Sequence, residues 1–80
     1  MKIIIEGKAH LEGTSKKTGK DYNFNQIHYL SPARGVEGRA AQVVTLDPKA
    51  YPIDDIIVGG LYEIEFDRSG YVVDLEYMGE

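Results

Sequence analysis

Three lysines and two aromatic residues lie close together in the first third of the chain. Lys16, Lys17 and Lys20 fall in a segment rich in Gly, Ser and Thr, and Tyr22 and Phe24 follow directly. Side chains two residues apart on a strand point to the same side, so we expect the two rings to lie next to each other. Lysine ammonium groups contact phosphates, and aromatic rings stack on unpaired bases. The pattern therefore predicts a site for a single-stranded nucleic acid on a hairpin.

Other side chains extend this candidate site. Arg34 and Arg39 flank the next loop and are expected to lengthen the row of cations, while Tyr29 is compatible with the core or with the floor of a groove. Lys8 and His10 share the outer face of the first expected strand and are weaker candidates. The candidate DNA-binding residues are Lys16, Lys17, Lys20, Tyr22, Phe24, Tyr29, Arg34 and Arg39.

Each of these residues also has a simpler interpretation. Lysines at a hairpin tip usually serve only solubility, and lone loop arginines do so more often still. Tyr22 and Phe24 are also compatible with a place in the core or at a dimer seam. Two neighbouring exposed rings favour a ligand, because soluble proteins rarely leave adjacent aromatic side chains uncovered.

Enzymatic chemistry finds little support in the sequence. There is no cysteine nucleophile, and His10 and His28 fall in separate expected strands without a cluster of carboxylates nearby in the chain. Asp54-Asp55 is typical of a helix start or a loop rather than of a catalytic pair. We therefore expect a protein that is not an enzyme and that uses no cofactor or metal.

Charge is divided unevenly along the chain. The 80 residues carry a net charge of −4. Residues 1–40 hold seven Lys/Arg against four Asp/Glu, which gives +3, and residues 41–80 hold two against nine, which gives −7. Because phosphate binding leaves a basic footprint, a polyanion is expected to bind the first half only.

The length of the chain limits its core. A single domain of 80 residues buries only about 60–65% of the surface of its unfolded chain. Without cysteine, no disulfide or thiolate metal site adds stability, so a homodimer is the expected source of further burial. The apolar run Ile3-Ile4-Ile5 is too short for a signal peptide or a membrane span, and we expect a cytoplasmic protein.

Alternating apolar residues predict an all-β chain, since no segment shows a helical period. Ile3, Ile5, Ala9 and Leu11 are expected on one face of the first strand, with a bulge or bend at Gly7. A Gly-rich turn is expected over 12–20. The strands are expected near 2–11, 21–30, 40–46, 61–66 and 71–77.

The second expected strand changes phase partway along. Tyr22 and Phe24 lie on its even side, whereas Ile27 and Tyr29 lie on its odd side. A bulge around Asn25-Gln26 is expected to reconcile the two sides.

Two later segments also inform the fold. Asp47-Pro48 is typical of a helix cap before a turn or short helix, which Tyr51-Pro52 is expected to end. In the last hairpin, cross-strand pairing is expected to gather acidic side chains that repel phosphates and keep this face solvated. These side chains are Glu63, Glu65, Asp74 and Glu76.

Five short strands in so short a chain predict an all-β, five-stranded oligonucleotide-binding (OB) Greek-key barrel from which the basic hairpin protrudes. An SH3-like barrel fits the same pattern, and the number of strands does not distinguish the two.

Residues 15–29, SKKTGKDYNFNQIHY, resemble the DNA-binding wing of the filamentous-phage gene V protein family. Members of that family are small dimeric OB-fold proteins that coat single-stranded DNA cooperatively. The resemblance implies that Lys16 replaces a wing arginine, that Tyr22 is the stacking tyrosine and that Phe24 is the apolar contact to bases. Tyr29 matches a tyrosine near the binding channel. Two further stretches agree loosely: Val44-Thr45-Leu46-Asp47 and Gly60-Leu61-Tyr62.

The chain departs from that family at several basic positions. Leu11 and Val43 stand where the family has an arginine and a lysine, and the acidic stretch Asp74-Leu75-Glu76 replaces an arginine of the last strand. The long final hairpin is cut to Asp67-Arg68-Ser69-Gly70. These departures imply fewer phosphate contacts and binding that depends more on stacking. The resemblance itself implies an origin in a phage or mobile element.

These observations together predict a sequence-tolerant single-stranded DNA-binding protein that serves replication or transfer of such an element. RNA is compatible with the same residues. The alternative is a protein-interaction module on an OB or SH3-like barrel, anchored by Tyr22 and Phe24, with the acidic hairpin facing a basic partner.

Overall fold

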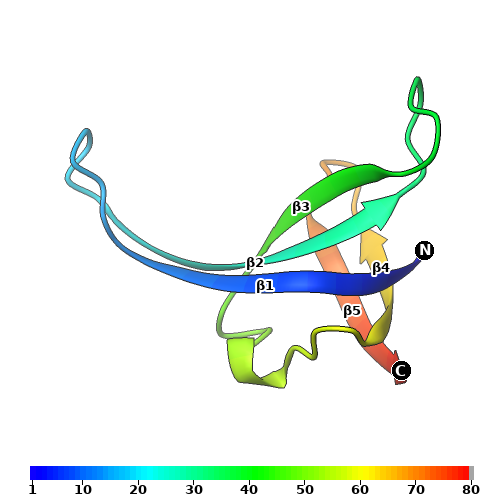
Figure 1. The fold of residues 1–80 in the computed structure, drawn as a ribbon. Helices are drawn as coiled ribbons and strands as arrows, with labels where there is room; N and C mark the ends of the chain where they lie inside the picture. The colour runs from blue at the N-terminus through cyan, green and yellow to red at the C-terminus, as the bar shows by residue number, and fades with distance from the viewer. Residues whose placement is uncertain (80) are drawn as a thin grey trace.

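The first strand organises the sheet. In the computed structural model, which describes residues 1–79, β1 (Lys2–Thr14) pairs with β4 through its first residues and with β2 from Ile5 onward. The strand order in the antiparallel sheet is β3-β2-β1-β4-β5 (Figure 1). The other elements are β2 (Asp21–Ser31), β3 (Ala40–Leu46), the 3-10 helix η1 (Ile53–Asp55), β4 (Leu61–Phe66) and β5 (Val72–Gly79).

The predicted all-β chain of five strands is confirmed. The third and fourth strands have the predicted bounds, whereas the first continues to Thr14 and the fifth runs from Val72 to Gly79. The turn predicted over 12–20 is therefore shorter, because the two strands remain paired as far as Thr14 and Asp21.

A register shift between Ile5 and Gly7 confirms the bulge predicted at Gly7. An extra residue on one strand reverses which side chains face inward beyond it. Ile3 and Ile5 are buried before the bulge, whereas Ala9 and Leu11 follow it and lie on the opposite face. The prediction that all four share one face is wrong for this reason. We call the side that carries Ile3 and Ile5 the core face and the other side the outer face.

β2 has no bulge of its own. Its pairs with β1 run without a shift from Ile27 to Asp21, so the bulge predicted at Asn25-Gln26 is wrong. The change of phase in the sequence arises because Asn25, a polar residue, is fully buried on the core face next to Ile27 and Tyr29. All even-numbered residues of β2 consequently lie on the outer face.

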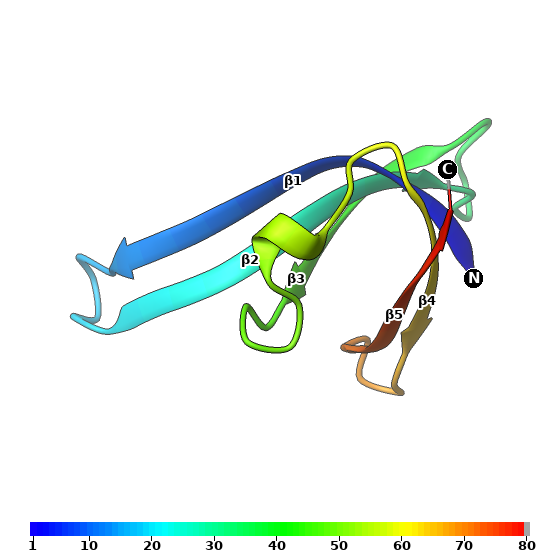
Figure 2. The same ribbon diagram turned by 90° about the horizontal axis from the view of Figure 1, so that it is seen from below.

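The core lies between the β1–β2–β3 part of the sheet and the β4–β5 hairpin, with η1 beneath β1 and β2 (Figures 1 and 2). β3 and β5 are the two edges, and among residues 1–79 no ladder of hydrogen bonds joins them, so this barrel-like sheet is not closed. The buried apolar residues are Ile3, Ile5, Ile27, Tyr29, Leu46, Ile56, Tyr62 and Ile64.

Of the turn or short helix predicted after Asp47-Pro48, the structure forms the turn. The Tyr51 amide donates to the Asp47 carbonyl at 2.9 Å, and the Lys49 amide donates to the Asp47 carboxylate, also at 2.9 Å. Because a residue before proline disfavours helical backbone, the turn ends at Tyr51 and η1 forms after Pro52. Nowhere in residues 1–79 is there a helix long and apolar enough to cross a membrane.

Candidate nucleic-acid interface

The β1–β2 hairpin projects from the rest of the sheet. β3 pairs with β2 only as far as Asn25, and β4 pairs with β1 only as far as Ile4. Residues 11–24, which we call the wing, therefore form a two-stranded arm that extends away from the core (Figures 1 and 2). An arm of this shape exposes both of its faces to a ligand.

The turn of the wing is fixed by its own backbone. The Ser15 amide donates to the Lys20 carbonyl at 2.8 Å, and the Gly19 amide donates to the Ser15 carbonyl at the same distance. Gly19 has a φ of 70°, which glycine adopts without strain. All three lysines of the turn are exposed, and their ammonium groups make no ion pair or hydrogen bond with residues 1–79: Lys16, Lys17 and Lys20.

The two predicted rings lie together on the outer face of the wing. The centroids of Tyr22 and Phe24 are 5.9 Å apart, with 42° between the ring planes. Tyr22 is 40% exposed and lies over Gly13, where an added Cβ atom would come within 2.8 Å of the tyrosine oxygen. Phe24 is partly buried opposite Leu11. Neither ring belongs to the core, so the placement of these rings in the core is not supported.

The row of side chains on the outer face continues along β2 beyond the wing. Gln26, His28 and Leu30 have the same parity as Phe24. His28 is exposed and lies against Gly7, whose added Cβ atom would be 3.7 Å from the imidazole ring. His28 is thus a third ring on this face, although it was not among the residues predicted from the sequence. Its parity with Tyr22 would have identified it if no bulge had been assumed within β2.

Tyr29 lies on the core face and does not belong to the exposed row. It is 5% exposed and packs with Ile5 and Ile27, and burial raises the pKa of its hydroxyl group. A ring in this position stabilises the core and is not accessible to a base. Tyr29 is therefore part of the core and not of the candidate interface.

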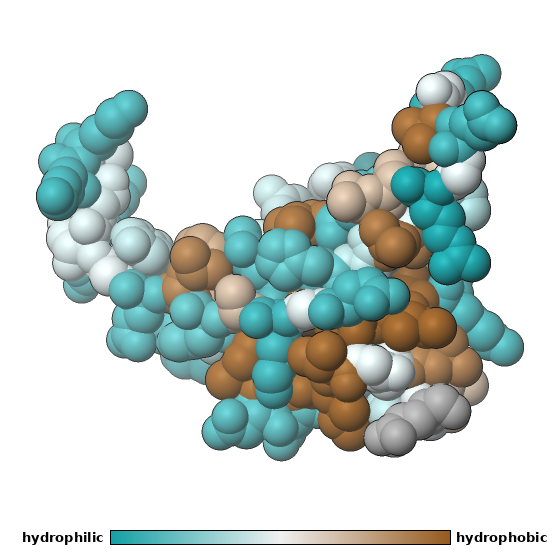
Figure 3. All heavy atoms as spheres, in the orientation of Figure 1, coloured by the Kyte–Doolittle hydropathy of each residue, from teal (hydrophilic) through white to brown (hydrophobic). Residues whose placement is uncertain are grey.

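Arg34 and Arg39 lie at the other end of β2 from the lysines. The 11 residues of β2 span about 35 Å at the rise of an extended strand. Both arginines are exposed, and the loop that carries them bends to the same side as the wing, away from η1 (Figure 1). The surface is hollowed between these two projections; the tip of the wing is hydrophilic, whereas the tip of the other projection combines hydrophilic and hydrophobic residues (Figure 3). The cations therefore stand at both ends of the outer face rather than in one continuous row.

Lys8 and His10 are on the core face because of the bulge at Gly7. The Lys8 ammonium group donates to the carbonyls of Ile53 and Ile56 at 2.9 and 2.8 Å. These contacts attach β1 to η1, so Lys8 is not free to bind a phosphate. The structure assigns it a structural role.

His10 joins the wing to the body through Asn25. Its Nδ1 atom is 2.6 Å from Asn25 Oδ1, and Asn25 Nδ2 donates to the Tyr51 carbonyl at 2.8 Å. The hydrogen bond with Asn25 raises the pKa of His10, and Glu12, whose carboxylate is 3.4 Å from Nε2, raises it further. This chain of contacts holds the base of the wing against the segment that follows β3.

The acidic side chains of the last hairpin pair as predicted. Glu63 stands opposite Glu76, and Glu65 stands opposite Asp74. Like charges opposite one another repel, and Glu63 is partly compensated by the Met1 amino group at 3.0 Å. A phosphate backbone is therefore repelled from this part of the molecule.

No protein-family model matches the chain, and no curated protein or solved structure shows significant similarity to it.

Proposed function

We propose that this protein is a non-enzymatic, sequence-tolerant single-stranded DNA-binding protein. The observation that carries the proposal is the row of rings on the outer face, exposed Tyr22 and His28 with half-buried Phe24, beside three unpaired lysines at the tip of the wing. Every base offers a flat face for stacking, so recognition of this kind tolerates any sequence.

The energies suffice for useful binding. Stacking contributes about 1–3 kcal/mol for each base, and a micromolar dissociation constant corresponds to about 8 kcal/mol. Two or three stacked bases together with a few phosphate contacts therefore give micromolar binding to a single strand. The acidic β4–β5 hairpin directs the strand toward the wing by repelling it elsewhere.

The strand order supports an OB-type Greek-key barrel as the finer description of the fold. In that fold, which is itself partly open, the face of strands 2 and 3 and the loop between strands 1 and 2 bind oligonucleotides. The outer face of β2 and the wing occupy the corresponding positions here. We also propose that the protein is a homodimer and is related to the gene V family. Its proposed role is in replication or transfer of a mobile element.

A mobility-shift assay with oligo-dT at low salt tests this function. Replacing Lys16, Lys17 and Lys20 with Gln is expected to weaken binding at least tenfold, because the phosphate contacts at the tip are lost. Lys49→Gln is the matched control, since Lys49 is an exposed lysine in the turn after β3. No shift with the unaltered protein, or equal losses in both variants, would contradict the proposal. A parallel titration with oligo-U measures any preference for RNA.

A further inference from the structure

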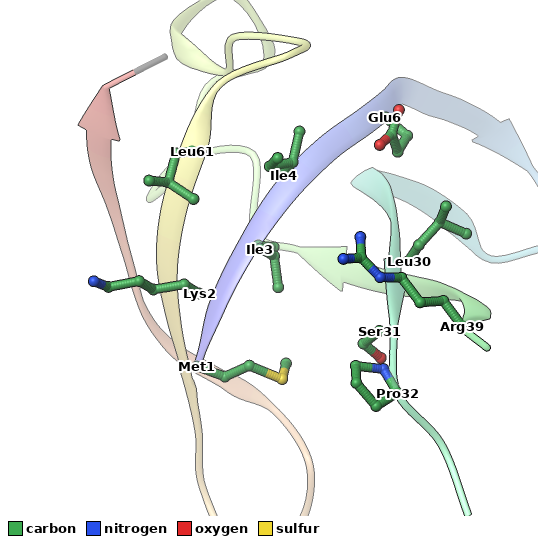
Figure 4. A pocket seen from close by; sticks show the side chains of 10 residues that line it. All are labelled: Met1, Lys2, Ile3, Ile4, Glu6, Leu30, Ser31, Pro32, Arg39 and Leu61. Carbon is green, nitrogen blue, oxygen red and sulfur yellow. The ribbon is translucent and has the colours of Figure 1, made fainter. Parts of the chain in front are cut away.

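A pocket opens on the outer face where β1 separates from β2. β1 pairs with β2 from Ile5 onward but with β4 over its first residues, so the start of β1 diverges from the end of β2. The space between them is about 230 Å³ and is bordered by Ile4, Leu30 and Pro32 (Figure 4). The pocket lies at the opposite end of β2 from the wing.

The lining combines apolar side chains with the charged side chains of Lys2, Glu6 and Arg39. Ile4 and Leu30 are 47% and 43% exposed, and Leu61 pairs with Ile4 across the β1–β4 ladder. The Arg39 guanidinium group is directed into the space between β1 and β2 (Figure 4). Arg39 makes no ion pair with any of residues 1–79. The Glu6 carboxylate also lines the pocket (Figure 4), so the site offers apolar contact area beside both a guanidinium group and a carboxylate.

This combination fits a nucleotide better than a larger ligand. Pockets for drug-sized molecules are about 300–1,000 Å³, so the smaller volume here suits a single base. Unstacked bases pack against flat apolar or guanidinium surfaces, and a guanidinium group also binds phosphate.

We propose that this pocket receives one unstacked base of the same DNA strand, with Arg39 contacting that base or its phosphate. The inference rests on the proposed function and extends it, because Leu30 belongs both to the pocket and to the outer-face row that begins at Tyr22. The distance along β2 from Tyr22 to Leu30 is about 27 Å, and one OB fold covers about 4–16 nucleotides. A strand stacked on the wing thus continues along β2 and ends in the pocket.

Titration with thymidine monophosphate, followed by NMR of the methyl groups, tests the pocket separately from the wing. Saturable shifts are expected at Ile4, Leu30 and Leu61, with a dissociation constant of about 1 mM. These shifts are expected to persist in a Tyr22→Ala/Phe24→Ala variant, because the wing is remote. Absence of shifts at 10 mM nucleotide, or equal shifts with inorganic phosphate alone, would overturn the inference.

Arg39→Gln is expected to weaken this binding at least fivefold, while Arg34→Gln, in the same loop but outside the pocket, leaves it unchanged. Equal effects of the two substitutions would overturn the inference.

The experiments distinguish a wrong pocket assignment from a wrong proposed function. If oligo-dT binds through the wing while the nucleotide causes no shift, only the pocket is wrong. If the nucleotide binds the pocket but the wing substitutions do not affect oligo-dT, the proposed function is wrong.

Discussion

At the scale of single residues, two large rings of the outer face each pack over a glycine of the opposite strand. Tyr22 lies over Gly13, and His28 lies against Gly7. A glycine in a strand weakens pairing, but a ring that packs over it recovers contact area and is held in place. The rings are thus positioned by the opposite strand and still expose a face for stacking.

Replacing a ring with Ala tests this role. Tyr22→Ala, Phe24→Ala and His28→Ala should each weaken binding to oligo-dT by about 1–3 kcal/mol, which is about 5- to 150-fold. Denaturant unfolding should show small changes for Tyr22 and His28, since both are exposed. Tyr71→Ala is the control, because Tyr71 is 73% exposed but lies at the β4–β5 hairpin. A ring whose removal unfolds the protein would prove to be structural.

Gly13→Ala tests the placement of Tyr22 without removing it. The new Cβ atom would come within 2.8 Å of the tyrosine oxygen, so the ring must move. We expect weaker DNA binding by fluorescence titration with no loss of stability, because Ala suits a strand better than Gly does. Gly7→Ala is the matched control, since its Cβ atom meets His28 at an ordinary 3.7 Å. Equal affinities of the two variants would show that the position of Tyr22 does not matter.

At the scale of elements, the wing is joined to the body by a polar connection. The side chain of Asn25 contacts both His10 and the Tyr51 carbonyl, and its residue is fully buried. Because a buried amide must keep its hydrogen bonds, this residue fixes where the wing leaves the core.

Loss of that connection should destabilise the fold. Asn25→Ala removes both contacts and leaves the Tyr51 carbonyl without this donor, at a cost of about 1–3 kcal/mol in the free energy of unfolding. Asn23→Ala, at an exposed position two residues away on the same strand, should change it by less than about 0.5 kcal/mol. Urea unfolding followed by circular dichroism compares the two, and similar values for both would contradict the role of Asn25.

His10 gives the same connection a pH dependence. Its pKa in the folded protein is raised above the ordinary 6.5, chiefly by the hydrogen bond with Asn25. The stabilisation is therefore complete below about pH 6.5 and is lost as the pH rises through the folded value. Urea midpoints should fall between about pH 6 and pH 8, and His10→Gln should remove this part of the slope. His28→Gln should retain it, and a slope that is unchanged in His10→Gln would contradict the assignment.

The sequence predicts strands more reliably than it predicts their faces. Alternation identified all five strands, and Gly7 identified the bulge in β1. The predicted faces of Ala9 and Leu11 are wrong because the phase of a strand depends on where the extra residue is inserted. The bulge predicted around Asn25-Gln26 is wrong because Asn25 is buried through partners 15 and 26 residues away in the chain, which the sequence pattern does not reveal.

At the scale of the whole molecule, charge and shape divide the protein in two. The unpaired lysines and arginines stand on the projections at both ends of the outer face, and the paired acids lie on the β4–β5 hairpin.

Because few cations are available, the affinity for single-stranded DNA should fall only gently as the salt concentration rises. The slope of log affinity against log salt is about −0.7 for each phosphate contacted. With the three wing lysines and two arginines as the upper limit, a slope steeper than about −4 would contradict this interface.

The central claim is that the outer-face rings stack on unpaired bases, and tyrosine fluorescence during titration with oligo-dT tests it most directly. The chain has six tyrosines and no tryptophan, so its emission comes from tyrosine alone, and comparison with a variant that lacks Tyr22 isolates the contribution of that residue. We expect saturable quenching with a micromolar dissociation constant at low salt, and its loss in the Tyr22→Ala/Phe24→Ala variant. No quenching at low salt, or the same quenching in that variant, would contradict the claim.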